Sequence, residues 1–211
     1  MDTKPQNSTI INVCVIPSVE AGNKCVQLSQ LLKSDGTMFV LDGKSKFAHM
    51  TVFMFRVKDS KIESVIEAVD KILENQKSFL CNQASPGFFM TKGRYYEVSY
   101  QKTPEFVALH ENLVKALSPI RINPGNPFEE GYFTPYTEEQ QKNAKETGYD
   151  LALNLFRPHV TLTRYFEGKV PETEPDLPVA NLSFQLGKVC VFKADDNGAV
   201  YEKLAEFEAM Q

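Results

Sequence analysis

The sequence predicts an α+β fold with mainly antiparallel strands, and three observations support this prediction. Strand-like and helix-like segments are interleaved, and the chain ends in a run of strands, an order typical of this class. The chain has 211 residues, of which 42% are hydrophobic and 24% charged, enough for a sizeable core. A His-x-Thr motif occurs at residue 49 and again at residue 159. We therefore expect one folding unit, residues 1–211, with two similar halves.

The strands are predicted from alternating or β-branched segments that end at turn residues. The first segment, TIINVCVI, ends at Pro17, and residues 47–57 alternate strongly between polar and apolar. The next two segments meet at Lys92-Gly93, which is typical of a hairpin, and Asp196-Asn197-Gly198 predicts a turn before the last strand. The expected strands are 9–16, 47–57, 78–90, 94–100, 155–166, 182–193 and 200–207.

Four helices are predicted from apolar residues at helical spacing and from capping residues. Residues 19–33 carry the first, and residues 62–73 the second, with Ser60 and Glu63 at capping-box spacing. Thr103 and Pro104 suit the N-cap and first turn of a helix that ends near residue 117. Residues 137–147 are polar and predict a short exposed helix.

Two segments are expected to lie outside the regular core. Residues 1–8 are polar, without the apolar stretch of a secretory signal, and predict a flexible leader. Residues 123–150 contain repeated proline and glycine and predict an enlarged loop. Its aromatic residues could stack a nucleobase or could pack on the loop itself, and the sequence leaves both interpretations open; they are Tyr132, Phe133, Tyr136 and Tyr149.

Charge and cysteine usage limit the partners and the compartment. The net charge of −4 argues against a protein that coats long duplex nucleic acid, although 41–58 and 157–169, which surround the two histidine motifs, are locally basic. No apolar run approaches the roughly 20 residues needed to cross a membrane. Four scattered cysteines without metal-ligand spacing indicate reduced thiols and a cytoplasmic location. We expect a monomer that needs no metal and no cofactor.

The two His-x-Thr motifs carry the candidate chemistry. They lie in the segments FAHMTVF (47–53) and RPHVTLT (157–163). On a strand, residues i and i+2 face the same side about 6.7 Å apart, so each histidine shares a face with its threonine. One imidazole can accept a proton from the attacking group while the other protonates the leaving oxygen, and hydroxyls can bind phosphate oxygens. His49 and His159 are therefore predicted to be catalytic, and Thr51 and Thr161 to bind substrate.

A structural role is the competing interpretation of each motif. A single His-x-Thr on a strand is most often a structural histidine. Two copies, each in an alternating apolar strand and a locally basic stretch, favour function. Arg164, just beyond the second motif, is a further substrate-binding candidate, and a solvated charge at the strand end is nearly as good an explanation. We interpret His110, on a helix, as structural.

Residues 156–164, FRPHVTLTR, resemble the second motif of the two-histidine (2H) phosphoesterase superfamily, in its 2′-5′ RNA ligase-like branch. Residues 47–52 resemble the first motif, with Val52 where leucine is commoner, and 189–207 resemble the closing hairpin. The resemblance covers most of residues 9–207. It implies a bilobal, pseudo-symmetric fold in which two mainly antiparallel sheets flank a central cleft and helices lie outside. It also implies that His49 and His159 form an acid–base pair, with Thr51 and Thr161 on the phosphate.

The expected function is metal-independent cleavage of a nucleotide or RNA-end phosphodiester, either a 2′,3′-cyclic phosphate or a 2′-5′ linkage. The resemblance also admits a hydrolase of cyclic oligonucleotides and an RNA 2′-5′ ligase. A non-catalytic module that binds nucleotide or RNA is the alternative from another class, and the intact motifs argue against it. Fold alone does not choose among these activities.

Overall fold

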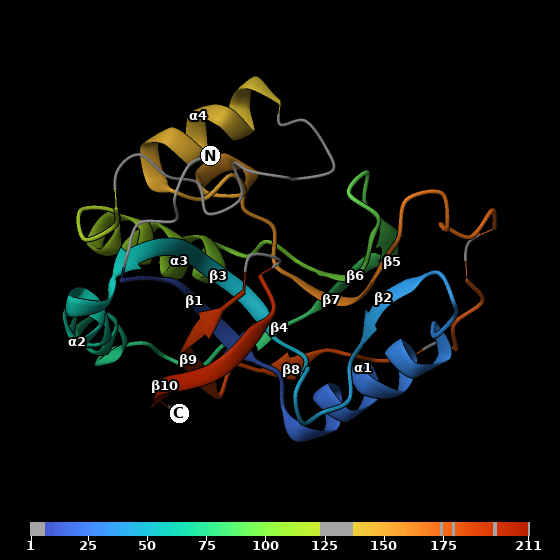
Figure 1. Ribbon diagram of the computed structural model, residues 1–211. Helices are drawn as coiled ribbons and strands as arrows, with labels where there is room; N and C mark the ends of the chain where they lie inside the picture. The colour runs from blue at the N-terminus through green and yellow to red at the C-terminus, as the bar shows by residue number, and fades with distance from the viewer. Residues whose placement is uncertain (1–6, 123–136, 174, 179, 196–197, 211) are drawn as a thin grey trace.

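Two four-stranded antiparallel sheets form the frame of the molecule (Figure 1). The computed structural model describes residues 7–122, 137–173, 175–178, 180–195 and 198–210. The first sheet has the strand order β10-β9-β1-β3 and the second β2-β7-β6-β5, and β4 pairs with β8 in a small third sheet. The strands are β1 (Ser8–Ile16), β2 (Thr37–Val40), β3 (Met50–Lys58), β4 (Leu80–Cys81), β5 (Gln83–Met90), β6 (Tyr95–Tyr100), β7 (His159–Tyr165), β8 (Phe184–Gln185), β9 (Lys188–Ala194) and β10 (Val200–Glu208).

Helices cover the two large sheets. The helices are α1 (Val19–Leu31), α2 (Ile62–Leu73), α3 (Pro104–Leu117) and α4 (Glu138–Thr147), with short 3-10 turns η1 (Asp59–Lys61) and η2 (Leu153–Leu155). α1 packs on β2 and β7 of the second sheet, whereas α3 packs on β3 and α2 on β10 of the first. Figure 1 shows α4 apart from these helices, at the top of the view. The expected α+β fold with two antiparallel sheets and outer helices is confirmed.

The predicted helix cap is confirmed in α3 and wrong in α2. Thr103 accepts a hydrogen bond from the backbone of Phe106 and has Pro104 after it, as predicted. Thr137 and Gln140 form a capping box at the start of α4. The predicted capping box of Ser60 is wrong, because residues 59–61 form a 3-10 turn and α2 begins after Lys61, which makes no side-chain cap.

Strand boundaries also differ from the prediction in particular places. β3 begins at Met50, so His49 lies just before the strand and not within it. The predicted strands 78–90 and 182–193 are each divided in two, and β2, the edge strand beside β7, was not predicted. Residues 1–6 of the expected leader and 123–136 of the expected loop, with Tyr132, Phe133 and Tyr136, lie outside the described residues.

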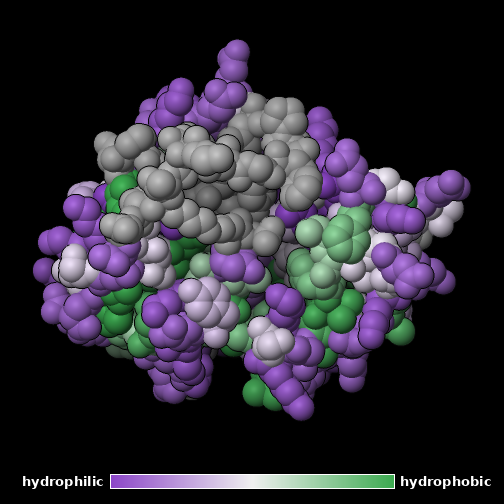
Figure 2. Space-filling view, in the orientation of Figure 1, coloured by the Kyte–Doolittle hydropathy of each residue, from purple (hydrophilic) through white to green (hydrophobic). Residues whose placement is uncertain are grey.

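The core lies between the sheets and their helices and explains the alternation in the sequence. In β7, Val160 and Leu162 are fully buried while His159 and Thr161 are partly exposed. In the coloured part of Figure 2, hydrophilic residues predominate, with hydrophobic ones in patches between them. All four cysteines are buried and free. Among the described residues, no helix combines the length and apolar character required to span a bilayer.

Candidate active site

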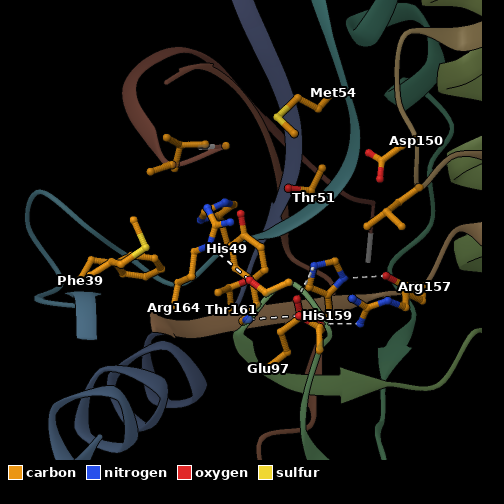
Figure 3. Close-up of a pocket in the computed structure, with 18 of the residues that line it drawn as sticks. Phe39, His49, Thr51, Met54, Glu97, Asp150, Arg157, His159, Thr161 and Arg164 are labelled. Carbon is orange, nitrogen blue, oxygen red and sulfur yellow. Dashed lines mark hydrogen bonds and ion pairs between the residues drawn. The ribbon is translucent and has the colours of Figure 1, made fainter. Parts of the chain in front are cut away.

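A cavity of about 820 Å³ brings the two His-x-Thr motifs together. His49 and Thr51 reach it from the start of β3, in the first sheet, and His159 and Thr161 from the start of β7, in the second. Figure 3 shows the four side chains gathered in one region of the pocket. Residues separated by about half of the chain therefore line one cavity.

The two histidines are held by the same local hydrogen bond. The Nδ1 atom of His49 lies 3.1 Å from the carbonyl oxygen of Phe47, and that of His159 lies 2.9 Å from the carbonyl oxygen of Arg157. Because a carbonyl oxygen only accepts, each Nδ1 must carry the hydrogen. The Nε2 atom of each neutral ring is then left with a lone pair, which is the form that accepts a proton.

The surroundings of both histidines disfavour the charged form overall, through different neighbours. Burial is the largest influence and lowers the pKa of His49, the charge of His159 lowers it further, and contacts with the Phe47 and Gly198 backbones and the charge of Asp195 oppose this. Burial also lowers the pKa of His159, the Glu97 carboxylate raises it, and Arg157 lowers it. Neutral imidazoles at both positions are therefore favoured more than in water.

Thr51 is positioned by a buried side chain of β1. Asn12 is 0% exposed, and its Nδ2 atom donates to the Thr51 Oγ1 atom at 2.9 Å. A hydroxyl that accepts this bond still has its own hydrogen to donate. That hydrogen is available to a hydrogen-bond acceptor in the cavity.

Glu97 and Arg157 also line the cavity, although sequence patterns predicted no role for either. Glu97 lies on β6, in register with Thr161 on β7, and its side chain is 3% exposed. Its Oε2 atom accepts a short hydrogen bond from Arg157 Nη1, and its Oε1 atom lies 3.6 Å from His159 Nε2. The Arg157 guanidinium also lies over the Phe89 ring, 4.8 Å from its centroid. Arg157 stands in the second motif, and that position was the one signal available for it.

Another part of the cavity wall comes from α4 and the residues after it. Tyr149 is only 4% exposed, and its ring meets Phe53 edge to face at 6.4 Å, so it packs in the core although it also lines the cavity. The Asp150 carboxylate accepts a hydrogen bond of 3.0 Å from Gln140 Nε2, and burial raises the pKa of Asp150 to about 6. This wall is thus built on the capped helix α4.

Comparison with solved structures places the fold. No protein-family model matches the chain, and no curated protein matches it. Escherichia coli LigT complexed with 3′-AMP superposes with a TM-score of 0.64 at 12% sequence identity, covering 97% of this chain and 99% of LigT. The chain has the LigT-like fold of the 2H phosphoesterases. TT0787 of Thermus thermophilus matches with a TM-score of 0.61 at 16% identity, over 94% of this chain and 97% of TT0787.

Within the LigT-like fold, Arg164 lies at the far end of β7 from His159. It lines the cavity but is 1% exposed, its guanidinium lies 4.4 Å from the centroid of the Tyr95 ring, and its Nε atom donates to the Gly93 carbonyl at 3.3 Å. The interpretation of Arg164 as a solvated charge at the strand end is therefore wrong. Its stacked guanidinium forms part of the cavity wall beside the hairpin of β5 and β6.

Proposed function

We propose that the protein is a phosphoesterase of the 2H superfamily that cleaves a phosphodiester in a nucleotide or at an RNA end. The observation that carries this proposal is the pair of histidines that face one cavity from two sheets, each tied at Nδ1 to a carbonyl two residues earlier. Proton transfer needs a base and an acid on either side of the reacting phosphate, and two imidazoles can supply both.

The proposed reaction moves two protons around one phosphorus. For a 2′-5′ linkage, the ribose 3′-hydroxyl attacks phosphorus, one histidine takes its proton, the bond to the 5′-oxygen breaks, and the second histidine protonates that oxygen. The products are a 2′,3′-cyclic phosphate and a 5′-hydroxyl. For a cyclic phosphate substrate, water replaces the ribose hydroxyl as the attacking group. Thr51 and Thr161 donate hydrogen bonds to the non-bridging oxygens, where charge develops.

A nucleotide substrate is supported by the structural relatives and by the dimensions of the site. LigT has been solved with phosphate, 3′-AMP, NADP⁺ and ATP. The cavity of this chain has the volume of a typical small-ligand site and combines aromatic walls with basic side chains, including Arg157 and Lys92. We propose that the phosphate lies between the histidines and that the nucleoside extends along these walls.

Turnover is expected to survive removal of divalent metal. Among the described residues, no three histidine, cysteine or acidic side chains are grouped as metal ligands would be. Activity measured after treatment with a chelator should equal that of untreated enzyme. An enzyme that is silent after chelation and restored by one divalent ion would contradict the two-histidine mechanism.

The test of the proposed function is a metal-free hydrolysis panel. It compares 2′,3′-cyclic nucleotides, 2′-5′ and 3′-5′ oligoadenylates and cyclic dinucleotides, with the His49→Ala/His159→Ala double variant as the control. Turnover of a cyclic phosphate or a 2′-5′ linkage that disappears in the double variant supports the proposal. Turnover retained by the variant contradicts the assignment of the histidines. No turnover, with nucleotide binding intact, would favour a binding module instead.

A further inference from the structure

The two histidines differ in the acidic group that acts on each. Glu97 Oε1 lies 3.6 Å from His159 Nε2, within ion-pair distance. Among the influences on the pKa of His159, Glu97 is second only to burial, whereas Asp195 is the smallest of those that act on His49. The site is therefore electrostatically asymmetric, although the Nδ1 atom of each ring contacts a carbonyl oxygen two residues earlier.

The Glu97 carboxylate is fixed in place by its own contacts. It is 3% exposed, it lies on the central strand β6, and its other oxygen binds the Arg157 guanidinium. A carboxylate that is held in this way cannot rotate freely away from His159. It acts on the ring in a poorly hydrated site, where charges interact more strongly than in water.

The distance leaves the reactive nitrogen of His159 available. At 3.6 Å, the contact between Glu97 and Nε2 is too long for a hydrogen bond, so it is electrostatic. The hydrogen on a protonated Nε2 can therefore still be donated to a substrate oxygen. Nδ1 is already committed to the Arg157 carbonyl, which leaves Nε2 as the one nitrogen of this ring that can transfer a proton.

We propose that Glu97 is a positioning residue that favours protonation of His159 over protonation of His49, so that His159 protonates the leaving oxygen and His49 deprotonates the attacking hydroxyl. This inference rests on the proposed function and assigns the roles that the sequence leaves open. In cleavage of a 2′-5′ linkage, His49 Nε2 takes the proton of the 3′-hydroxyl, the new bond from this oxygen to phosphorus forms, and the bond from phosphorus to the 5′-oxygen breaks. His159 Nε2 gives its proton to the 5′-oxygen, and solvent exchange restores both rings.

The direct test is a side-chain NMR titration, because the chain has only three histidines, His49, His110 and His159, to assign. Within the described part of the chain, the charged or titratable groups that face His159 are Glu97 from β6, Arg157 from the segment before β7, and His49 from the segment before β3. Glu97→Gln keeps the shape of the side chain and removes its charge, so the pKa of His159 should fall by about one pH unit or more. The pKa of His49 should change less than that of His159, and the weaker repulsion from a less charged His159 should act to raise it.

Two further variants make the titration decisive. Arg157→Gln removes the opposing positive charge and should raise the pKa of His159, so the result does not depend on the stability of Glu97→Gln alone. Glu111→Gln makes the same charge change on the exposed side of α3 and should leave His159 unchanged. A pKa of His159 that is the same in wild type, Glu97→Gln and Arg157→Gln would overturn the proposal.

A leaving-group comparison tests the role of the proton. A 2′-5′-linked diadenosine needs its 5′-oxygen protonated, whereas adenosine 2′-(p-nitrophenyl phosphate) releases a phenolate that needs little protonation. Glu97→Gln should lose about tenfold or more turnover of the diadenosine at pH 7.5 and little of the p-nitrophenyl ester. Equal losses on both substrates would overturn the assignment of His159 as the acid. Failure of the wild type on both would contradict the proposed function, and the titration would still decide whether Glu97 favours protonation of His159.

Discussion

At the scale of single residues, the contact between Asn12 and Thr51 shows how a core strand prepares a cavity residue. Asn12 is fully buried on β1, and β1 pairs with β3 directly beside Thr51. Its amide donates to the threonine oxygen at 2.9 Å, which fixes the direction of the remaining hydroxyl hydrogen. A donor whose direction is set before substrate arrives loses little energy to reorganisation during the reaction.

Removal of this donor should reduce turnover without loss of the fold. Thr51→Val keeps the shape of the side chain, and we expect kcat to fall by about 100-fold or more, as when one donor is removed from an oxyanion site. Thr51→Ser should retain most of the activity. Asn12→Leu should slow wild type but should add little to Thr51→Val, since it acts through the same hydroxyl. Additive losses in the double variant, measured by steady-state kinetics, would show that Asn12 acts in another way.

The residues of the candidate site could be predicted only where their spacing in the sequence determines which side chains share a face of a strand. His159 and Thr161 were predicted to share a face because alternation on a strand follows from local geometry. Glu97 reaches His159 only through the register of β6 against β7, in which it pairs with Thr161 across 64 positions of sequence. No local pattern marks such a carboxylate, and its burial becomes visible only when the second sheet is assembled.

At the scale of elements, His110 joins three parts of the chain. It lies on α3, its Nδ1 atom donates to the Val52 carbonyl of β3 at 2.7 Å, and its Nε2 atom accepts from the Leu153 backbone of η2 at 2.8 Å. Its ring stacks on Phe156 with centroids 4.1 Å apart. Both nitrogens therefore hold the neutral ring in the core, beside the segment that leads into the second motif.

This arrangement predicts that acid weakens the fold through His110. Burial lowers the pKa of His110 to about 4, so between pH 6.5 and 4 the unfolded chain binds the proton and the folded chain does not. The free energy of unfolding should fall by about 3 kcal/mol across this range from His110 alone. His110→Phe should be less stable at pH 7 and should show a correspondingly smaller decrease on acidification, measured by denaturant unfolding at each pH. Since the pKa values of His49 and His159 are lowered as well, the difference between the two proteins is the informative quantity.

The helices and strands could be predicted from the sequence where local propensity and tertiary pairing favour the same structure. Thr103 and Pro104 give the start of α3 because both act through local geometry. The segment of Phe47 alternates like the strand that follows it, yet β3 begins only at Met50, because residues before it have no partner in the β1 register. β2 has four residues at the sheet edge, too few to give a clear periodic signal.

At the scale of the whole molecule, the site depends on the approach of two sheets. His49 lies just before β3, the edge strand of one sheet, and His159 begins β7, an inner strand of the other, so among the described residues no single element contributes both. A ligand whose phosphate contacts both motifs must therefore link the two sheets. Such a ligand binds the folded state alone and stabilises the whole fold by mass action.

A phosphate-bearing ligand should therefore raise the melting temperature, and the two motifs should be needed together. Adenosine 3′-monophosphate at one hundred times its Kd stabilises the folded state by about 2.7 kcal/mol. For a chain of this size, that free energy corresponds to a rise of roughly 5–10 °C in Tm.

Thr51→Val and Thr161→Val remove a donor from one sheet each, so either variant should weaken binding at a fixed ligand concentration. The double variant should lose most of the shift in Tm. Adenosine, which lacks the phosphate, is the matched control ligand and should give a smaller shift that does not depend on the threonines. If the double variant is stabilised by the nucleotide as much as wild type, the phosphate binds away from the cleft between the sheets.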